Sequence, residues 1–181
     1  NGKTGNWFVD PHDYTVAASG GDQTGTQLSA SLATTNVTLQ SASGSQTGSG
    51  NININDGVSW SANTTLTLTA TNNVNINANI TASGSNTGLA INPNTSNLAE
   101  SATGGRLNIG GGISIKLPNV SSSASSNSLV ISGAPYSVIN NINDLQGINT
   151  NLNGKYALGS DIEASSTIGW NSGIGFIPIG G

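Results

Sequence analysis

The sequence predicts an all-β protein built as a parallel β-helix, with three short strands per lap and two short helical insertions. A ten-residue motif occurs three times, at residues 51–60 (NININDGVSW), 73–82 (NVNINANITA) and 106–115 (RLNIGGGISI). Aliphatic and polar residues alternate in the first half of each copy, as in a strand with one buried face. The middle of each copy is rich in Gly, Asn and Asp, which tolerate the backbone of a sharp corner. Each copy is therefore predicted to form a strand, a corner and a second strand.

A third strand in each lap is predicted from a shorter apolar motif at residues 37–39, 66–68, 89–91 and 129–131. The first three occurrences each precede one copy of the ten-residue motif. Self-similarity over a few tens of residues is typical of a solenoid, whose parallel strands stack about 4.8 Å apart. The aliphatic residues expected to share its core are Ile52, Ile54, Val58, Leu66, Leu68, Val74, Ile76, Ile80, Leu89, Ile91, Leu107, Ile109, Ile113, Leu129 and Ile131.

The composition excludes several classes of function. Only 7% of the 181 residues are charged, the net charge is −4, and no Lys or Arg cluster occurs. Binding to nucleic acid or to an anionic membrane surface is therefore disfavoured, because both need grouped cations. Neither a signal peptide nor a membrane-spanning apolar run is found. Having no Cys fits a protein that folds after export, and we expect the chain to be one segment of a longer protein.

The elements that precede the regular laps are a strand at residues 6–10, a strand at 14–16 and a short helix near 26–33. Leu28 and Leu32 are four residues apart, which favours a helix, with Thr26 as the expected N-cap. The regular laps are predicted over residues 36–131.

A second set of elements repeats this layout. Residues 136–138 (YSV) echo residues 14–16 (YTV), a helix is predicted near residues 141–152, and a strand follows at 156–158. We therefore expect one β-helical domain in which residues 1–135 form a first repeat. Residues 136–181 would begin a second one. The aliphatic stripe of the helix, with spacings of 3, 3 and 4 residues behind Asn141 as the expected N-cap, consists of Ile142, Leu145, Ile148 and Leu152.

Two groups of titratable residues are candidates for chemistry. Asp10, His12 and Asp13 lie in DPHD, which holds the single His of the chain and admits a metal or acid–base role. Asp161 and Glu163 are two residues apart on an expected strand, a spacing that a glycosidase pair could use. A polar turn and a solvated face are the favoured interpretations, because neither group has a second set of partners nearby.

The remaining candidates are aromatic or glycine-rich. Trp170 lies in GWNSGIG and is the best candidate for an exposed sugar-binding platform, whereas Trp60 is in phase with the core residues Ala82 and Ile115. Gly110–Gly112 lacks the Lys-Ser/Thr of a phosphate-binding loop and is interpreted as a corner.

Outward-facing positions predict side-chain ladders on successive laps. Asn53, Asn75 and Asn108 are expected to stack and to share side-chain hydrogen bonds. An ice-binding face would need Thr at every lap, but the corresponding set on another face is mixed. It consists of Thr38, Thr67, Ala90 and Val130.

The order of these motifs resembles the passenger repeats of filamentous-haemagglutinin-like exoproteins of two-partner secretion systems. The resemblance rests on NWFVDPHDYTV, NVTLQSASG, GNININDGVSW, TTLTLTATNNVNINANI and GRLNIGGGISI. The tail, NGKYALGSDIEASSTIGWNSGIGFIPIGG, resembles the segment that leads into GLUG-type repeats. The family's N-terminal secretion domain is not recognised in this sequence. The resemblance implies a right-handed parallel β-helix, an outer-membrane partner pore and display at the bacterial cell surface as an adhesin.

We therefore predict a secreted, non-catalytic segment that gives a surface protein its rod and its attachment surface. No catalytic residue, cofactor or metal ligand is assigned, and Trp170, Asp10, His12 and Asp13 remain weak binding candidates. The expected partners are the outer-membrane secretion pore and a host-cell, matrix or neighbouring-cell surface. The alternatives are a carbohydrate-binding or carbohydrate-active β-helix module and an ice-binding solenoid.

Overall fold

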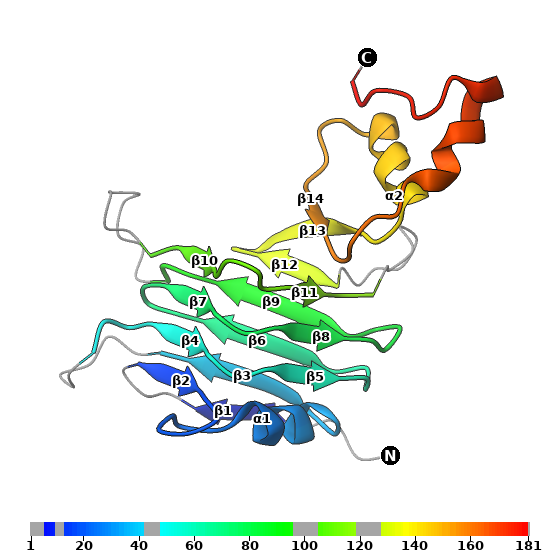
Figure 1. Cartoon of the computed structure of the whole chain (residues 1–181). Coiled ribbons are helices and arrows are strands. Elements are labelled where there is room, and N and C mark those ends of the chain that lie inside the picture. The colour runs from blue at the N-terminus through cyan, green and yellow to red at the C-terminus, as the bar shows by residue number, and fades with distance from the viewer. Residues whose placement is uncertain (1–5, 10–12, 42–47, 96–104, 119–127, 181) are drawn as a thin grey trace.

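The computed structural model describes residues 6–9, 13–41, 48–95, 105–118 and 128–180 (Figure 1). It is mostly β, with parallel sheets and a few short helices. Over most of its length the chain visits three sheets in a fixed order and returns to the first sheet one strand further along. Each lap between Asn36 and Lys116 contains three strands, as predicted, and this succession is compatible with a parallel β-helix.

The three sheets differ in their number of strands. The seven-stranded sheet has the order β1 (Asn6–Val9), β3 (Asn36–Gln40), β6 (Thr65–Thr69), β9 (Gly88–Asn92), β12 (Leu129–Ile131), β13 (Ala134–Ile139) and β14 (Tyr156–Leu158). The four-stranded sheet has the order β10 (Leu107–Ile109), β7 (Val74–Ile76), β4 (Ile52–Ile54) and β2 (Tyr14–Val16). The three-stranded sheet has the order β11 (Ile115–Lys116), β8 (Ile80–Ala82) and β5 (Val58–Trp60).

Residues of the same kind lie above one another in consecutive laps. Ile54 pairs with Ile76, and Ile76 pairs with Ile109, in parallel register. The inward side chains of the three sheets meet in one hydrophobic cluster, which also includes Trp60. The predicted core residues that are buried there are Ile52, Ile54, Val58, Leu66, Leu68, Val74, Ile76, Ile80, Leu89, Ile91 and Leu129.

The register of the third lap corrects the sequence prediction. Ile113 was expected opposite Ile80, but Ile115 pairs with Ile80 instead. The corner before it is two residues longer than in the other laps, with Gly112 at φ +74° and the Ile113 N–H donating to the Gly110 carbonyl (3.3 Å). A shift of two residues keeps each side chain on its expected face, so Ile115 still packs against the core while Ile113 lies in the corner and is only partly buried.

Helix α1 (Gly25–Leu32) occupies the place of a strand one lap before β5, and its inward residues Leu28 and Leu32 are buried. Thr24, and not Thr26, is the N-cap, because Thr24 and Gln27 form a reciprocal capping box. The helix backbone lies so close to the next lap that a Cβ on Gly25 would be 2.1 Å from the Gly57 carbonyl oxygen. Only glycine fits this approach.

The C-terminal elements depart from the parallel succession. β13 pairs antiparallel with β12 after a tight turn, and β14 pairs parallel with β13. Residues 136–138 therefore lie in the seven-stranded sheet, whereas the similar residues 14–16 lie in the four-stranded sheet. The predicted second helix is present as α2 (Ile142–Gly147) with Asn141 as its N-cap, and the 3-10 turn η1 (Ile148–Thr150) continues it. A separate 3-10 segment, η2 (Ser165–Gly173), follows β14.

We predict that Ile76→Ala lowers the free energy of unfolding by about 2–5 kcal/mol, because it opens a cavity inside the stacked laps. Thr67→Ala is the matched control: Thr67 lies in a neighbouring strand between two buried leucines and alternates out of the core, so its loss should cost less than about 1 kcal/mol. Urea unfolding of both variants measures the difference. Equal destabilisation by the two changes would contradict the assigned faces.

Candidate functional site

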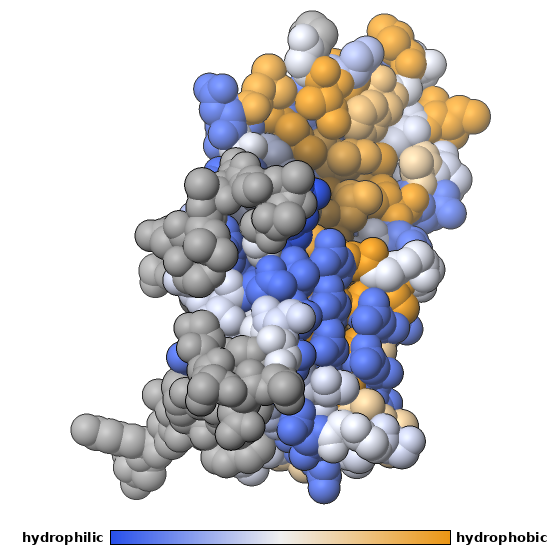
Figure 2. All heavy atoms as spheres, turned by 90° about the vertical axis from the view of Figure 1, so that its left-hand side faces the viewer, coloured by the Kyte–Doolittle hydropathy of each residue, from blue (hydrophilic) through white to orange (hydrophobic). Residues whose placement is uncertain are grey.

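A ladder of side chains runs along the outward face of the four-stranded sheet. The Asn75 Nδ2 donates to Asn53 Oδ1 (2.7 Å), and the Asn108 Nδ2 donates to Asn75 Oδ1 (2.8 Å). Below them, the Asn53 Nδ2 donates to Thr15 Oγ1 (3.3 Å). The predicted asparagine ladder is confirmed. Figure 2 shows the hydrophilic band on the side of the molecule where these laps stack.

A second column, one position before each of these strands, was not predicted. The backbone N–H of Asn51 donates to Asp13 Oδ1 (2.7 Å), that of Asn73 to Asn51 Oδ1 (3.1 Å), and that of Arg106 to Asn73 Oδ1 (2.8 Å). Each side chain thus satisfies a backbone donor of the following lap where the chain enters a strand. The signal in the sequence was an Asp or Asn directly before the first apolar residue of a strand.

Asp13 therefore has a structural role. Besides Asn51, it accepts a hydrogen bond from the Ser49 N–H (3.0 Å). Its predicted companions Asp10 and His12 lie outside the described residues, so the metal or acid–base hypothesis for this group stays untested. Where the structure is described, no group of three or more His, Cys, Asp or Glu could hold a metal ion.

The carboxylate pair near the C-terminus does not lie on a strand. Asp161 and Glu163 precede η2 in an irregular segment, which corrects the strand expected there. Glu163 accepts a hydrogen bond from the Ser165 N–H (2.7 Å), and this bond lowers the pKa of the fully exposed carboxylate. Its environment is that of a turn-capping residue. A general acid would instead need a raised pKa.

Tyr14 is a buried titratable residue of the first lap. Burial inside the first lap, assisted by the charge of Asp22, raises the pKa of the Tyr14 phenol to about 12. The hydroxyl therefore stays neutral over the physiological range and acts as a packed polar group, not as a base.

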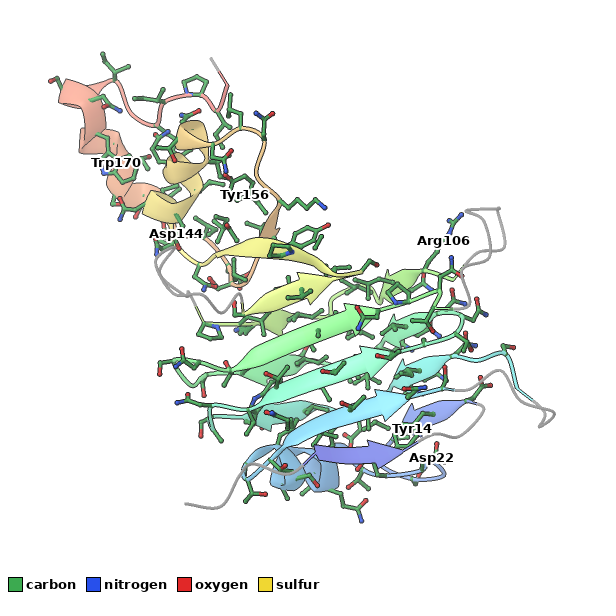
Figure 3. All side chains as sticks on the ribbon, turned by 180° about the vertical axis from the view of Figure 1, so that it is seen from behind. Tyr14, Asp22, Arg106, Asp144, Tyr156 and Trp170 are labelled. Carbon is green, nitrogen blue, oxygen red and sulfur yellow. The ribbon has the colours of Figure 1, made fainter. Side chains whose placement is uncertain are left out.

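Two of the three tryptophans, Trp60 and Trp170, lie in different surroundings. Trp60 is buried in the core, as predicted, and its Nε1 donates to the Thr64 carbonyl (3.1 Å). Trp170 is half-buried and stacks on Phe176 with the ring centroids 6.5 Å apart. Figure 3 shows Trp170 in the C-terminal elements, at the opposite end of the molecule from Tyr14 and Asp22. The candidate polar and aromatic residues are thus not gathered in one place.

An aliphatic groove lies at the C-terminal end of the laps, and we call it the end groove. Its cavity volume is about 200 Å³, and it joins the last strands of all three sheets. The apolar surface at this end is visible in Figure 2. The lining residues are Ile91, Leu107, Ile109, Ile113, Ile115, Leu117, Leu129, Ile131, Val138, Ala157 and Leu158.

The end groove explains the core predictions that the structure corrects. Ile109 is 53% exposed, and Leu107, Ile113 and Ile131 are only partly buried. All four line the end groove, and β10 and β11, which flank it, are the last described strands of their sheets. Because no described strand follows β10 or β11, the aliphatic side chains at this end of the laps line a groove instead of being fully buried.

The outward face of the seven-stranded sheet carries Thr38, Thr67, Ala90 and Val130 in continuous register. The regular threonine array that an ice-binding face would need is therefore interrupted.

No known protein family and no solved structure matches the chain. A stretch of 49 residues is 49% identical to halomucin of Haloquadratum walsbyi. The matched stretch makes up 25% of this chain, and its share of the length of halomucin rounds to 0%. No helix in the described part of the chain is long and apolar enough to cross a membrane.

We predict that Asn75→Ala lowers the free energy of unfolding by about 1–2 kcal/mol, because it removes both hydrogen bonds of the central rung of the ladder. The control is Asn86→Ala, since the Asn86 side chain is exposed and makes no hydrogen bond within the described residues. That change should cost less than about 0.5 kcal/mol. Chemical denaturation compares the two, and an unaffected Asn75→Ala variant would argue that the ladder contributes no stability.

Proposed function

We propose that this chain is a non-catalytic rod segment of an exported bacterial surface protein of the filamentous-haemagglutinin-like class, folded as a right-handed parallel β-helix. Its task is to give reach and an attachment surface. Two-partner secretion through an outer-membrane pore would deliver it. A host-cell, matrix or neighbouring-cell surface would be its target.

The observation that carries this proposal is the in-register stacking of the laps. Inward positions are filled by aliphatic side chains from three sheets, and outward positions carry polar ladders. Such a stack lengthens by adding laps and tolerates loops of different length between its strands. The polar candidates are dispersed, and the described cavity is lined by aliphatic residues. Both features favour a structural role over catalysis.

Adhesion can be tested with beads coated with the chain. The beads are added to epithelial monolayers and to wells coated with collagen or laminin. A variant carrying Ile54→Asp and Ile76→Asp, which places charges in the core, serves as the unfolded control. We expect several-fold more beads to be retained with the folded chain on at least one surface. Equal retention of the two on every surface, or release of reducing sugars from polysaccharides by the chain, would contradict the proposal.

A further inference from the structure

The open edge of β10 presents unpaired backbone groups. The Val74 N–H donates to the Arg106 carbonyl (2.9 Å), and the Gly110 N–H donates to the Ile76 carbonyl (2.9 Å). Residues 106 and 110 therefore direct these groups toward β7. Because backbone groups alternate along a strand, those of Leu107 and Ile109 point the other way, where no described strand follows.

The opposite end of the same sheet is sealed. The outer edge of β2 is covered by residues 21–23: the Thr15 N–H donates to Asp22 Oδ2 (2.7 Å), and the Asp22 N–H donates to the Thr15 carbonyl (2.8 Å). The Ala17 N–H donates to the Gln23 carbonyl (2.9 Å). Helix α1 closes the adjoining sheet below β5. Within the four-stranded sheet, the open edge among the described residues therefore lies at the β10 end only.

The end groove needs an occupant that is both apolar and extended. A small apolar molecule would bury the free N–H and C=O groups of Leu107 and Ile109 without partners, which costs free energy for each group. An added strand would satisfy those groups and would place alternate side chains in the groove. Ile109, at 53% exposure, would then gain the cover that Ile54 and Ile76 already have.

The outward side chains of the last lap define what the added strand should carry. Asn108 donates its Nδ2 to Asn75, so its Oδ1 is the end of the ladder and can accept from an amide. In the column one residue before these strands, the side chains of Asn51 and Asn73 each accept a backbone hydrogen bond from the following lap. The residue at this position in the last lap is Arg106, whose side chain is a cation. Lys116 adds a second cation on the outward face of β11. Both side chains are exposed and form no ion pair within the described residues.

We propose that the end groove and the free edge of β10 bind an extended segment of another polypeptide as an added parallel strand. The segment carries an acidic residue followed by aliphatic, Asn or Thr, and aliphatic residues. The acidic residue lies beside Arg106, the central Asn continues the ladder from Asn108, and the aliphatic residues fill the groove. The proposed function does not require this interaction, so either can fail without the other.

The probe is a synthetic peptide of residues 73–82 carrying Asn73→Asp, because the native segment stacks in this register one lap below. Binding to the full chain is measured by titration calorimetry, and the contact is located by hydrogen exchange. We expect saturable one-to-one binding, with new protection at the amides of Leu107 and Ile109.

Variants test the assigned contacts. Ile109→Lys should weaken binding by about tenfold or more, because it places a charge in the end groove. Ile174→Lys is the matched control: Ile174 is 85% exposed and does not line the groove, so affinity should stay unchanged. Arg106→Asp should weaken the acidic peptide and favour the same peptide carrying Asn73→Lys.

Several results would overturn the proposal. These are no saturation below about 1 mM peptide, equal binding by Ile109→Lys, and protection confined to other edges such as β14. Self-association of the chain that protects Leu107 and Ile109 without any peptide would assign the edge to a second copy, and would equally reject the proposed occupant.

Discussion

The stacking of like residues in successive laps is the constraint on which the rest of this structure depends. When Ile54, Ile76 and Ile109 occupy one column, every aliphatic residue has an aliphatic neighbour one strand away. The same register brings Asn53, Asn75 and Asn108 within hydrogen-bonding distance. The backbone ladder, the core and the polar ladder are therefore consequences of one repeat. The connections between strands remain free to differ in length.

A stack of this kind has two ends, and the chain treats them differently. In the first lap, α1 covers β5, and residues 21–23 form hydrogen bonds with the outward backbone groups of β2. Among the described residues, no strand or helix covers β10 and β11 of the last lap in this way, although β13 continues the seven-stranded sheet. The free edge of the four-stranded sheet is consequently at this end, and the outward face of that sheet carries repetitive polar side chains with structural partners.

Much of the fold could be predicted because aliphatic alternation and Asn-rich corners are local signals. The two-residue shift at Ile113 could not, because a period of two leaves either register compatible with the buried face. The N-cap was misplaced because Thr24 and Thr26 both suit that position, and only the partner Gln27 decides between them. The antiparallel β13 follows Ser132 and Gly133, which both have positive φ. A Ser-Gly pair between two apolar runs is a signal for a two-residue hairpin turn, but the turn was not predicted from the sequence. The role of Asp13 depends on a neighbour 38 residues away.

The most direct test of the stacked register is a set of amide–amide contacts measured by NMR on the isotope-labelled chain. The account predicts that Thr15, Asn53, Asn75 and Asn108 form a single continuous series of nearest neighbours, each contacting only the residues one lap before and after. Contacts offset by a residue or more, or an antiparallel pattern between β4 and β7, would contradict it.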